Sequence, residues 1–244
     1  MSLSPAARHT QQSEIAADRR MEALGVPDSI PISLGYNCFV RVFLQEFLKA
    51  TARYPFDWVG TPMWAICELM DADFAEFCPR ERLTPRKRFT DDDEIFLTNT
   101  RYNMVFQHDY GKDHAAIPRD TYERVSEEYE RRIQRWRDAL AGSQHLLFFR
   151  LEASERSRVE YEGSVRPKTE SEYLWEFTEK LKTRGVNYHV VYITHTQPQG
   201  YDAERKIINL KYTPKKAGMV VMGRHIDAIV TANQKFIRSC ITGK

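Results

Sequence analysis

The sequence predicts an α/β fold, specifically a three-layer α/β/α sandwich with a mainly parallel central sheet. Short apolar runs typical of buried strands alternate with amphipathic segments of about 10 to 20 residues that are long enough to be helices. Such alternation indicates βαβ units, which form parallel sheets covered by helices on both faces. With 244 residues, 42% of them hydrophobic and 29% charged, the chain can bury a sizeable core. We expect a flexible tail over residues 1–13 and a single α/β domain over residues 14–244.

Two strand–helix units are predicted near the N-terminus, after a helix over residues 14–24. In the first unit, an apolar strand over 30–34 leads through turn residues into a helix that begins at Cys38. In the second unit, a short strand over 54–59 precedes the pair Thr61-Pro62. A proline at the first helical position is typical of a helix start.

The middle of the chain is predicted to contain loops, two paired strands and the clearest helix. The basic segment 80–88 and the acidic segment 91–94 are expected to be loops. Strands over 95–98 and 103–108 are expected to pair with each other. In the helix over 119–141, apolar residues recur at spacings of three and four, with charged residues on the other face.

The C-terminal part continues the alternation of strands and helices. A buried strand over 146–151 is followed by a long charged loop over 152–168. Residues 169–172 (Thr-Glu-Ser-Glu) form a capping box that begins a helix reaching Gly185. The remaining expected elements are strands over 190–194, 206–210 and 219–222 and a last helix over about 225–240.

Charge balance and cysteine content limit the classes of function. The 36 basic and 34 acidic residues nearly cancel, so no nucleic acid or membrane partner is expected. Apolar runs are shorter than the roughly 20 residues that span a bilayer, and the polar first twenty residues do not resemble a signal peptide. The four scattered cysteines lack zinc-site spacing, which indicates free thiols and a cytoplasmic protein. Because ligand-spaced histidines, a Walker loop and a dinucleotide-binding glycine motif are all missing from the sequence, we expect no metal and no cofactor.

Cys38 is the leading candidate for catalysis. A strand end and a tight turn at Gly35 place it at the start of an amphipathic helix. A thiol there lies near the positive end of the helix dipole and near unpaired backbone N–H groups, which favour the nucleophilic thiolate. The N–H groups of Cys38 and Phe39 could also stabilise an oxyanion. The alternative is a buried structural cysteine, since free cysteines are often core residues.

His108 is the candidate base for Cys38, because an apolar strand delivers it to the point where the chain could reach a cleft. A neutral imidazole at this position could accept the thiol proton. Asp109 could orient the ring provided that the strand has already ended. Asp57 is the other candidate, since a carboxylate between two aromatic residues needs a partner. The alternatives are a structural histidine and a helix-capping role for Asp57.

Asn37 and Arg150 are the candidate substrate-binding residues. Asn37 lies in the predicted turn, and Arg150 ends an apolar strand, where its guanidinium could bind a carboxylate or a phosphate. Arg150 could instead pair with Asp57 or Glu152 as part of the structure. The basic segment 80–88 could attract an anionic ligand, with a solvated surface loop as the alternative.

These segments, in this order, resemble an uncharacterised family described as papain-like cysteine peptidases. The resemblance implies Cys38 as nucleophile and His108 as its base. It also implies, as the alternative fold, a papain-like arrangement in which a helical lobe carries the cysteine and an antiparallel sheet carries the histidine. A looser similarity links the turn to capsule-polysaccharide biosynthesis acyltransferases with a Gly-Asn-Cys turn, although Tyr36 here separates Gly35 from Asn37. The motifs that carry the resemblance are Ser33-Leu34-Gly35-Tyr36-Asn37-Cys38, Pro55-Phe56-Asp57-Trp58, Phe106-Gln107-His108-Asp109-Tyr110, Tyr129-Glu130-Arg131-Arg132 and Leu147-Phe148-Phe149-Arg150.

The residues and the resemblance together predict a thiol-dependent hydrolase or acyltransferase with a Cys–His pair, acting on a small-molecule, glycan or peptide substrate. A second hypothesis is a non-catalytic binding domain for an anionic glycan or nucleotide-like ligand. A third is a transferase in polysaccharide biosynthesis that does not use the thiol. The sequence gives no prediction of the oligomeric state.

Overall fold

A computed structural model provides the structure of the protein. The predicted tail over 1–13 and the acidic segment 91–94 lie outside the residues it describes. The described residues are 19–87, 95–106, 108–110, 117–153, 167–213 and 219–244.

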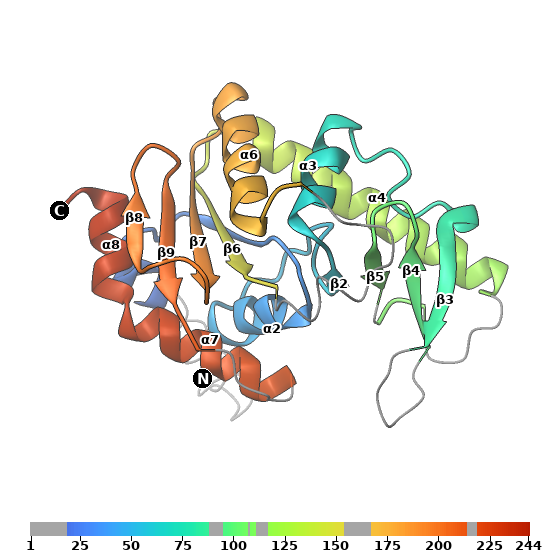
Figure 1. The fold of residues 1–244 in the computed structure, drawn as a ribbon, viewed down its shortest axis with the longest axis horizontal. Coiled ribbons are helices and arrows are strands. Elements are labelled where there is room, and N and C mark those ends of the chain that lie inside the picture. Colours follow the sequence, from blue (N-terminus) through green and yellow to red (C-terminus); the bar gives the residue numbers. More distant parts are fainter. Residues whose placement is uncertain (1–18, 88–94, 107, 111–116, 154–166, 214–218) are drawn as a thin grey trace, which may run out of the picture.

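A five-stranded sheet forms the centre of the fold, and all of its neighbouring strands are parallel except the last pair (Figure 1). Its strands are, in spatial order, β1 (Ile30–Ser33), β6 (Leu146–Leu151), β7 (Tyr188–Thr194), β9 (Ile207–Lys211) and the antiparallel edge strand β8 (Gly200–Asp202). Every residue of β6 and β7 is buried. Burial on both faces explains why these strands read as continuous apolar runs rather than as an alternation.

The two faces of this sheet belong to two separate hydrophobic cores. Along β6, Leu146 and Phe148 contribute to one core, whereas Leu147, Phe149 and Leu151 contribute to the other, as the two-residue period of a strand requires. The first core includes residues of α3 (Met63–Asp71), α4 (Arg119–Ala141) and α6 (Glu170–Thr183). The second includes residues of α2 (Cys38–Phe47), α7 (Met219–Ala232) and α8 (Gln234–Thr242). The predicted three-layer α/β/α sandwich is therefore confirmed (Figure 1).

A second, antiparallel sheet has the order β2 (Val59–Gly60), β5 (Met104–Phe106), β4 (Ile95–Asn99) and β3 (Leu83–Lys87). The predicted pairing of the two middle strands is confirmed. The papain-like alternative is realised only in part. The helix that begins at Cys38 packs on the parallel sheet, whereas the segment with His108 follows the antiparallel strand β5.

Four sequence-based element predictions were wrong. The segment 80–88 forms a short 3₁₀ helix (Arg80–Arg82) and the edge strand β3, because pairing with β4 outweighs its basic composition and charged residues are common on edge strands. Within 54–59, only Val59 is in a strand, since residues 55–58 form a turn. The remaining corrections concern the C-terminus: residues 219–222 begin α7 instead of forming a strand, and the predicted last helix is two helices that meet at Asn233.

Short apolar runs such as 219–222 fit a strand or a buried helix equally well, so periodicity alone could not separate them. No helix among the described residues combines the length and the apolar character needed to cross a membrane.

The capping box at the start of α6 gives a test of local helix stability. Thr169 Oγ1 accepts the Glu172 N–H at 3.3 Å, and Glu172 Oε2 accepts the Thr169 N–H at 2.6 Å. We predict that Thr169→Ala lowers the free energy of unfolding by about 1 kcal/mol, because the Glu172 N–H loses its acceptor and Glu172 Oε2 loses the hydroxyl that donates to it. Urea unfolding would measure the change. Thr169→Ser, which keeps the hydroxyl, is the matched control, and an equal loss in both variants would contradict the assignment.

Candidate active site

The turn between β1 and α2 is built from two successive residues in the left-handed region. Gly35 has φ +72° and Tyr36 has φ +76°. A β-carbon at Gly35 would lie 3.2 Å from the carbonyl oxygens of both Phe56 and Val59, so both the backbone and the space require glycine there. The tyrosine has no such freedom and is held in a conformation that costs energy. Strain of this kind is maintained only where the surroundings fix the backbone.

The turn ends in a helix cap that places Cys38 at the first position of α2. Asn37 is the N-cap, and its Oδ1 accepts the Phe39 N–H at 2.9 Å. The Phe39 N–H predicted to stabilise an oxyanion therefore already has an acceptor. Cys38 itself is 5% exposed and precedes the rest of the helix. Its position at the positive end of the helix dipole agrees with the sequence-based placement.

Arg150 is completely buried and holds the turn through hydrogen bonds to the backbone. Its Nη1 donates to the carbonyl oxygens of Leu34 at 2.7 Å and Thr61 at 2.8 Å, and its Nε donates to Glu170 Oε1 at 3.0 Å. The guanidinium also lies 5.7 Å from the centre of the Tyr36 ring. These contacts make Arg150 a positioning residue for the turn. With no exposed surface in this structure, its predicted substrate-binding role remains a prediction.

His108 follows the antiparallel strand β5 and packs against Trp58, which directly precedes β2. Its side chain is exposed, and its ring meets the Trp58 ring edge-on with 5.5 Å between centroids. Gly60 pairs with Val105, and a β-carbon at Gly60 would lie 3.2 Å from the Tyr36 carbonyl oxygen and 3.4 Å from Val105 Cβ. The strand that leads to His108 therefore packs close to the turn that leads to the thiol.

Asp57 is completely buried and forms an ion pair with Arg41 of α2. Its Oδ2 lies 3.3 Å from Arg41 Nη1 and accepts the Tyr54 N–H at 3.0 Å. Arg41 also donates to the carbonyl oxygens of Ala50 and Ala52. Burial raises the pKa of Asp57 to about 6, against the opposing effect of the Arg41 charge. These contacts tie α2 to the loop after it, so Asp57 supports the helix that carries the thiol.

Asp109 is held from the side of α4. Its Oδ2 accepts the Tyr129 hydroxyl at 2.7 Å, and its Oδ1 lies 3.6 Å from Arg132 Nη2. Burial raises the pKa of Asp109, while the Tyr129 hydroxyl, Arg132 and the charge of His108 lower it. The role of Asp57 or Asp109 in orienting His108 remains a prediction.

A second acid–imidazole pair, Glu152 and His195, lies at the carboxyl ends of β6 and β7. Glu152 Oε2 lies 3.0 Å from His195 Nδ1 and accepts the His195 N–H at 2.7 Å. Hydroxyl groups of Thr194 and Thr196 donate to the same carboxylate at 2.7 and 2.6 Å. Burial alone would raise the pKa of Glu152, but these hydrogen bonds outweigh it and lower the pKa. Glu152 is therefore an ionised group close to the imidazole, although His195 Nδ1 makes no hydrogen bond among the described residues.

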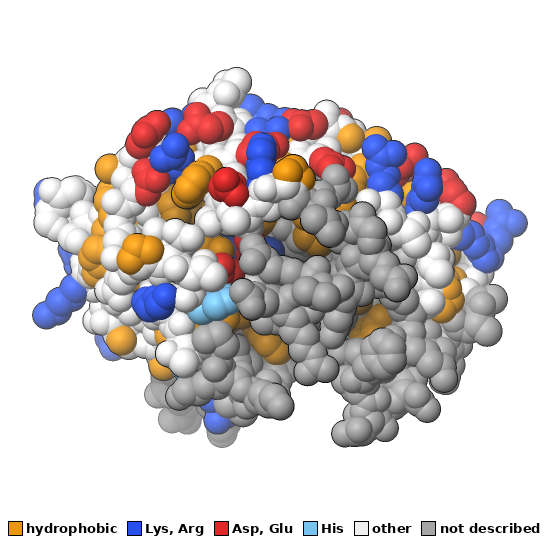
Figure 2. Space-filling model, in the orientation of Figure 1, with side chains coloured by type: hydrophobic (Ala, Val, Ile, Leu, Met, Phe, Trp, Pro, Cys, Tyr) orange, Lys and Arg blue, Asp and Glu red, His pale blue; other side chains and the backbone are white. Residues whose placement is uncertain are grey.

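The His195 ring is accessible from outside. Its side chain is 19% exposed and its ring meets Tyr212 edge-on at 5.8 Å between centroids. In the orientation of Figure 1, Figure 2 shows a histidine side chain at the surface near the tip of β7. Carboxyl ends of parallel strands are where α/β proteins bind ligands, and β7 is two strands away from β1, which precedes Cys38.

The pair was missed because Glu152 and His195 are far apart in the sequence, and only the neighbouring positions of β6 and β7 bring them together. One signal was present: Glu152 and His195 each come directly after the last residue of a buried strand. Within the part of the chain that the structure describes, no group of three or more His, Cys, Asp or Glu side chains is placed to hold a metal ion.

An α/β sheet with a thiol at a helix N-terminus, and with imidazoles near that turn and along the same sheet edge, has the components of a cysteine hydrolase. The comparison with protein families agrees with this class. The chain belongs to the family described as "Putative papain-like cysteine peptidase (DUF1796)", whose model matches residues 30–198. The match includes Cys38, His108 and His195. Searches among curated proteins and among solved structures found no match.

The raised pKa of Asp57 predicts a specific pH dependence of stability. An aspartate with pKa 3.8 in the unfolded chain and about 6 in the folded protein binds its proton more tightly when folded. Its contribution to stability is therefore complete below pH 3.8 and is lost as the pH rises through 6. We predict that the free energy of unfolding of the wild type, minus that of Asp57→Asn, falls by about 2 kcal/mol between pH 4.5 and 7.

Urea unfolding at several pH values would measure this difference. If the variant loses contacts with Arg41, the difference in free energy of unfolding shifts by the same amount at every pH in this range. A difference that stays constant, or that rises with pH, would contradict the raised pKa.

Proposed function

We propose that this protein is a cysteine hydrolase in which Cys38 attacks an acyl carbon. The observation that carries the proposal is the placement of Cys38 at the first position of α2, after a strained turn that Arg150 and Gly35 hold in place. Family membership supports the same class of chemistry. We expect the substrate to be a peptide, or a glycan or small molecule with an amide or ester bond.

The reaction would proceed in two steps. In the first, an imidazole takes the thiol proton while Sγ bonds to the acyl carbon, and the leaving amine or alcohol receives that proton as its bond breaks. In the second, water attacks the thioester, the imidazole takes a proton from the water, and the thiol is restored as the acid is released. An acyltransferase would differ only in that a second substrate replaces water.

The imidazole has two candidates. His108 is the base predicted from the sequence, and it packs against Trp58. His195 is the alternative, and it has an ionised carboxylate, Glu152, 3.0 Å from Nδ1. In a catalytic triad the acid accepts a hydrogen bond from Nδ1 and leaves Nε2 to exchange the proton. His195 Nδ1 makes no such bond among the described residues, so the ring would have to turn to form one.

The four cysteines of the chain are free thiols, and we propose on this basis that the enzyme works in the cytoplasm. The alternative of a non-catalytic binding domain relied on Arg150 and on the basic segment 80–88 to bind the ligand. The guanidinium of Arg150 is fully buried, so Arg150 gives that alternative no support.

The proposal predicts that Cys38 is the most reactive thiol of the protein. Burial raises the pKa of Cys67 to about 12 and that of Cys78 to about 11, and burial also raises the pKa of Cys240. We expect the pKa of Cys38 to lie well below the usual ~8.5 of a thiol. The pH dependence of iodoacetamide alkylation, followed by peptide mapping, measures all four thiols in one sample.

Histidine variants then identify the base. Removing the correct imidazole, in His108→Ala or in His195→Ala, should raise the pKa of Cys38. His145→Ala is the matched control, because His145 directly precedes the opposite, amino end of β6 and pairs with His189. An unreactive Cys38 that is alkylated more slowly than the other three thiols would overturn the proposed function.

A further inference from the structure

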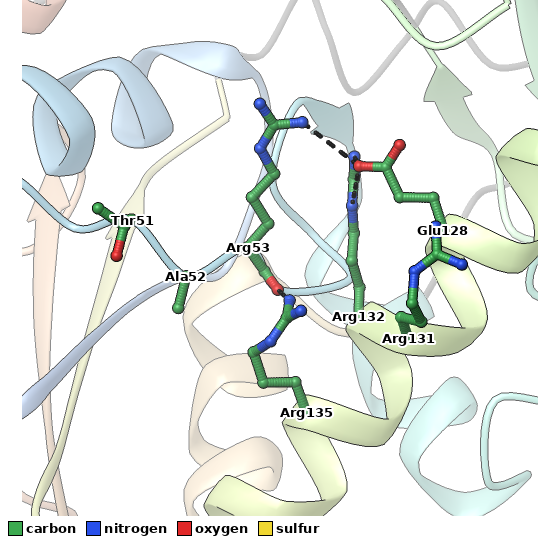
Figure 3. A pocket seen from close by; sticks show the side chains of 7 residues that line it. All are labelled: Thr51, Ala52, Arg53, Glu128, Arg131, Arg132 and Arg135. Carbon is green, nitrogen blue, oxygen red and sulfur yellow. Dashed lines mark hydrogen bonds and ion pairs between the residues drawn. The ribbon is translucent and has the colours of Figure 1, made fainter.

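A cavity of about 430 Å³ lies between the loop 51–53 and the side of α4, and it is lined mainly by arginines. Its volume is within the roughly 300–1,000 Å³ of small-molecule sites. Figure 3 shows Arg53 on the loop side and Arg132 on α4 converging on Glu128, while Arg135 reaches the backbone of Arg53. No role in the hydrolase chemistry is assigned to this cavity.

The helix contribution comes from one face of α4. Glu128, Arg131, Arg132 and Arg135 are spaced at i, i+3, i+4 and i+7, which places them next to one another along the helix. Like charges at these spacings repel each other. Together with Arg53 from the loop, four guanidinium groups face a single carboxylate, so the cavity has an excess of three positive charges.

The one carboxylate is already shared. Arg53 Nη1 lies 3.3 Å from Glu128 Oε1, and Arg132 binds the same oxygen with Nε at 3.2 Å and with Nη2. Arg131 has only an exposed contact of 3.8 Å with Glu127. Arg135 donates to a carbonyl oxygen, which carries no full charge. Arg132 also lies 3.6 Å from Asp109 outside the cavity. The walls themselves still carry four guanidinium groups and one carboxylate, and among the described residues Arg135 has no carboxylate partner.

Arg132 gives the independent indication of a ligand. Its side chain is 2% exposed and lines the cavity, and its Nη1 has no hydrogen-bond partner among the described residues. A buried guanidinium donor without an acceptor is costly, and an anionic oxygen is the strongest acceptor it can receive. Planar guanidinium groups bind the tetrahedral oxygens of phosphate in pairs of parallel hydrogen bonds.

We propose that this cavity binds a small molecule with a phosphate group, held by Arg53, Arg131 and Arg135 above the buried Arg132. A phosphate monoester carries a charge close to −2, which suits the net positive charge of the cavity walls. None of the residues that line the cavity is proposed to take part in the hydrolase reaction, so the proposal does not depend on that activity.

Isothermal titration calorimetry of the full chain with inorganic phosphate and with glucose 1-phosphate, at constant ionic strength, tests the proposal. We expect both to bind, and we expect Arg53→Gln and Arg135→Gln to weaken binding by about tenfold or more. Glu128→Gln should tighten it, because a competing carboxylate is removed. Equal affinities would mean that the phosphate alone is recognised, and tighter binding of glucose 1-phosphate would mean that the cavity also contacts the sugar.

Arg124→Gln is the matched control, because Arg124 is an exposed arginine of α4 outside the cavity. Its affinity should stay within about twofold of the wild type. If one of the other variants unfolds in a thermal melt, Arg131→Gln takes its place, because the Arg131 side chain is exposed. No binding to the wild type, or equal losses in Arg124→Gln and Arg135→Gln, would overturn the proposal in favour of solvated surface arginines.

Discussion

The buried ion pair of Arg150 and Glu170 is the interaction on which the site depends. Taking these two charges out of water is favourable only when hydrogen bonds satisfy what the pair itself leaves open. Here the acceptors are the backbone carbonyls of Leu34 and Thr61, which come just before α2 and α3, while Glu170 is the first residue of α6. Arg150 Nη2 has no hydrogen-bond partner among the described residues. One guanidinium therefore joins the starts of three helices at the carboxyl ends of the parallel strands. The strained β1–α2 turn can persist because this pair and the close packing at Gly35 leave it no room to relax.

The distribution of charge separates the two inferred sites. At the sheet edge, the carboxylates of Glu152 and Glu170 are buried and hydrogen-bonded, and burial together with these charges raises the pKa of Tyr192 and Tyr212. An end of the sheet with two buried carboxylates and a single buried arginine favours a neutral acyl group over an anion. The cavity beside α4 has the opposite character, with arginines in excess. A substrate with a neutral scissile bond and a separate phosphate-bearing ligand would each find a site of suitable charge.

The sequence was a good guide wherever local pattern and tertiary structure agree. The helix over 119–141, the strand over 146–151 and the capping box at Thr169 occur as predicted, because each has a strong period or cap and is buried on the expected side. It was a poor guide to β3, whose existence depends on pairing with β4. For the site, the position of Cys38 followed from local turn chemistry. The Glu152–His195 pair could not be predicted, since it requires knowing that β6 and β7 are neighbours. The burial of Arg150 under the turn likewise depends on where α6 places Glu170.

The central claim, that Arg150 holds the turn which presents Cys38, is tested most directly by amide hydrogen exchange of Arg150→Lys. Lysine keeps the positive charge but cannot reproduce the fixed fork of donors to two carbonyls and a carboxylate. With both proteins folded, the account predicts faster exchange in the peptide containing residues 34–39 and at the starts of α3 and α6, with protection of β7 unchanged. Unchanged exchange in that peptide, or an equal increase throughout the sheet, would contradict it.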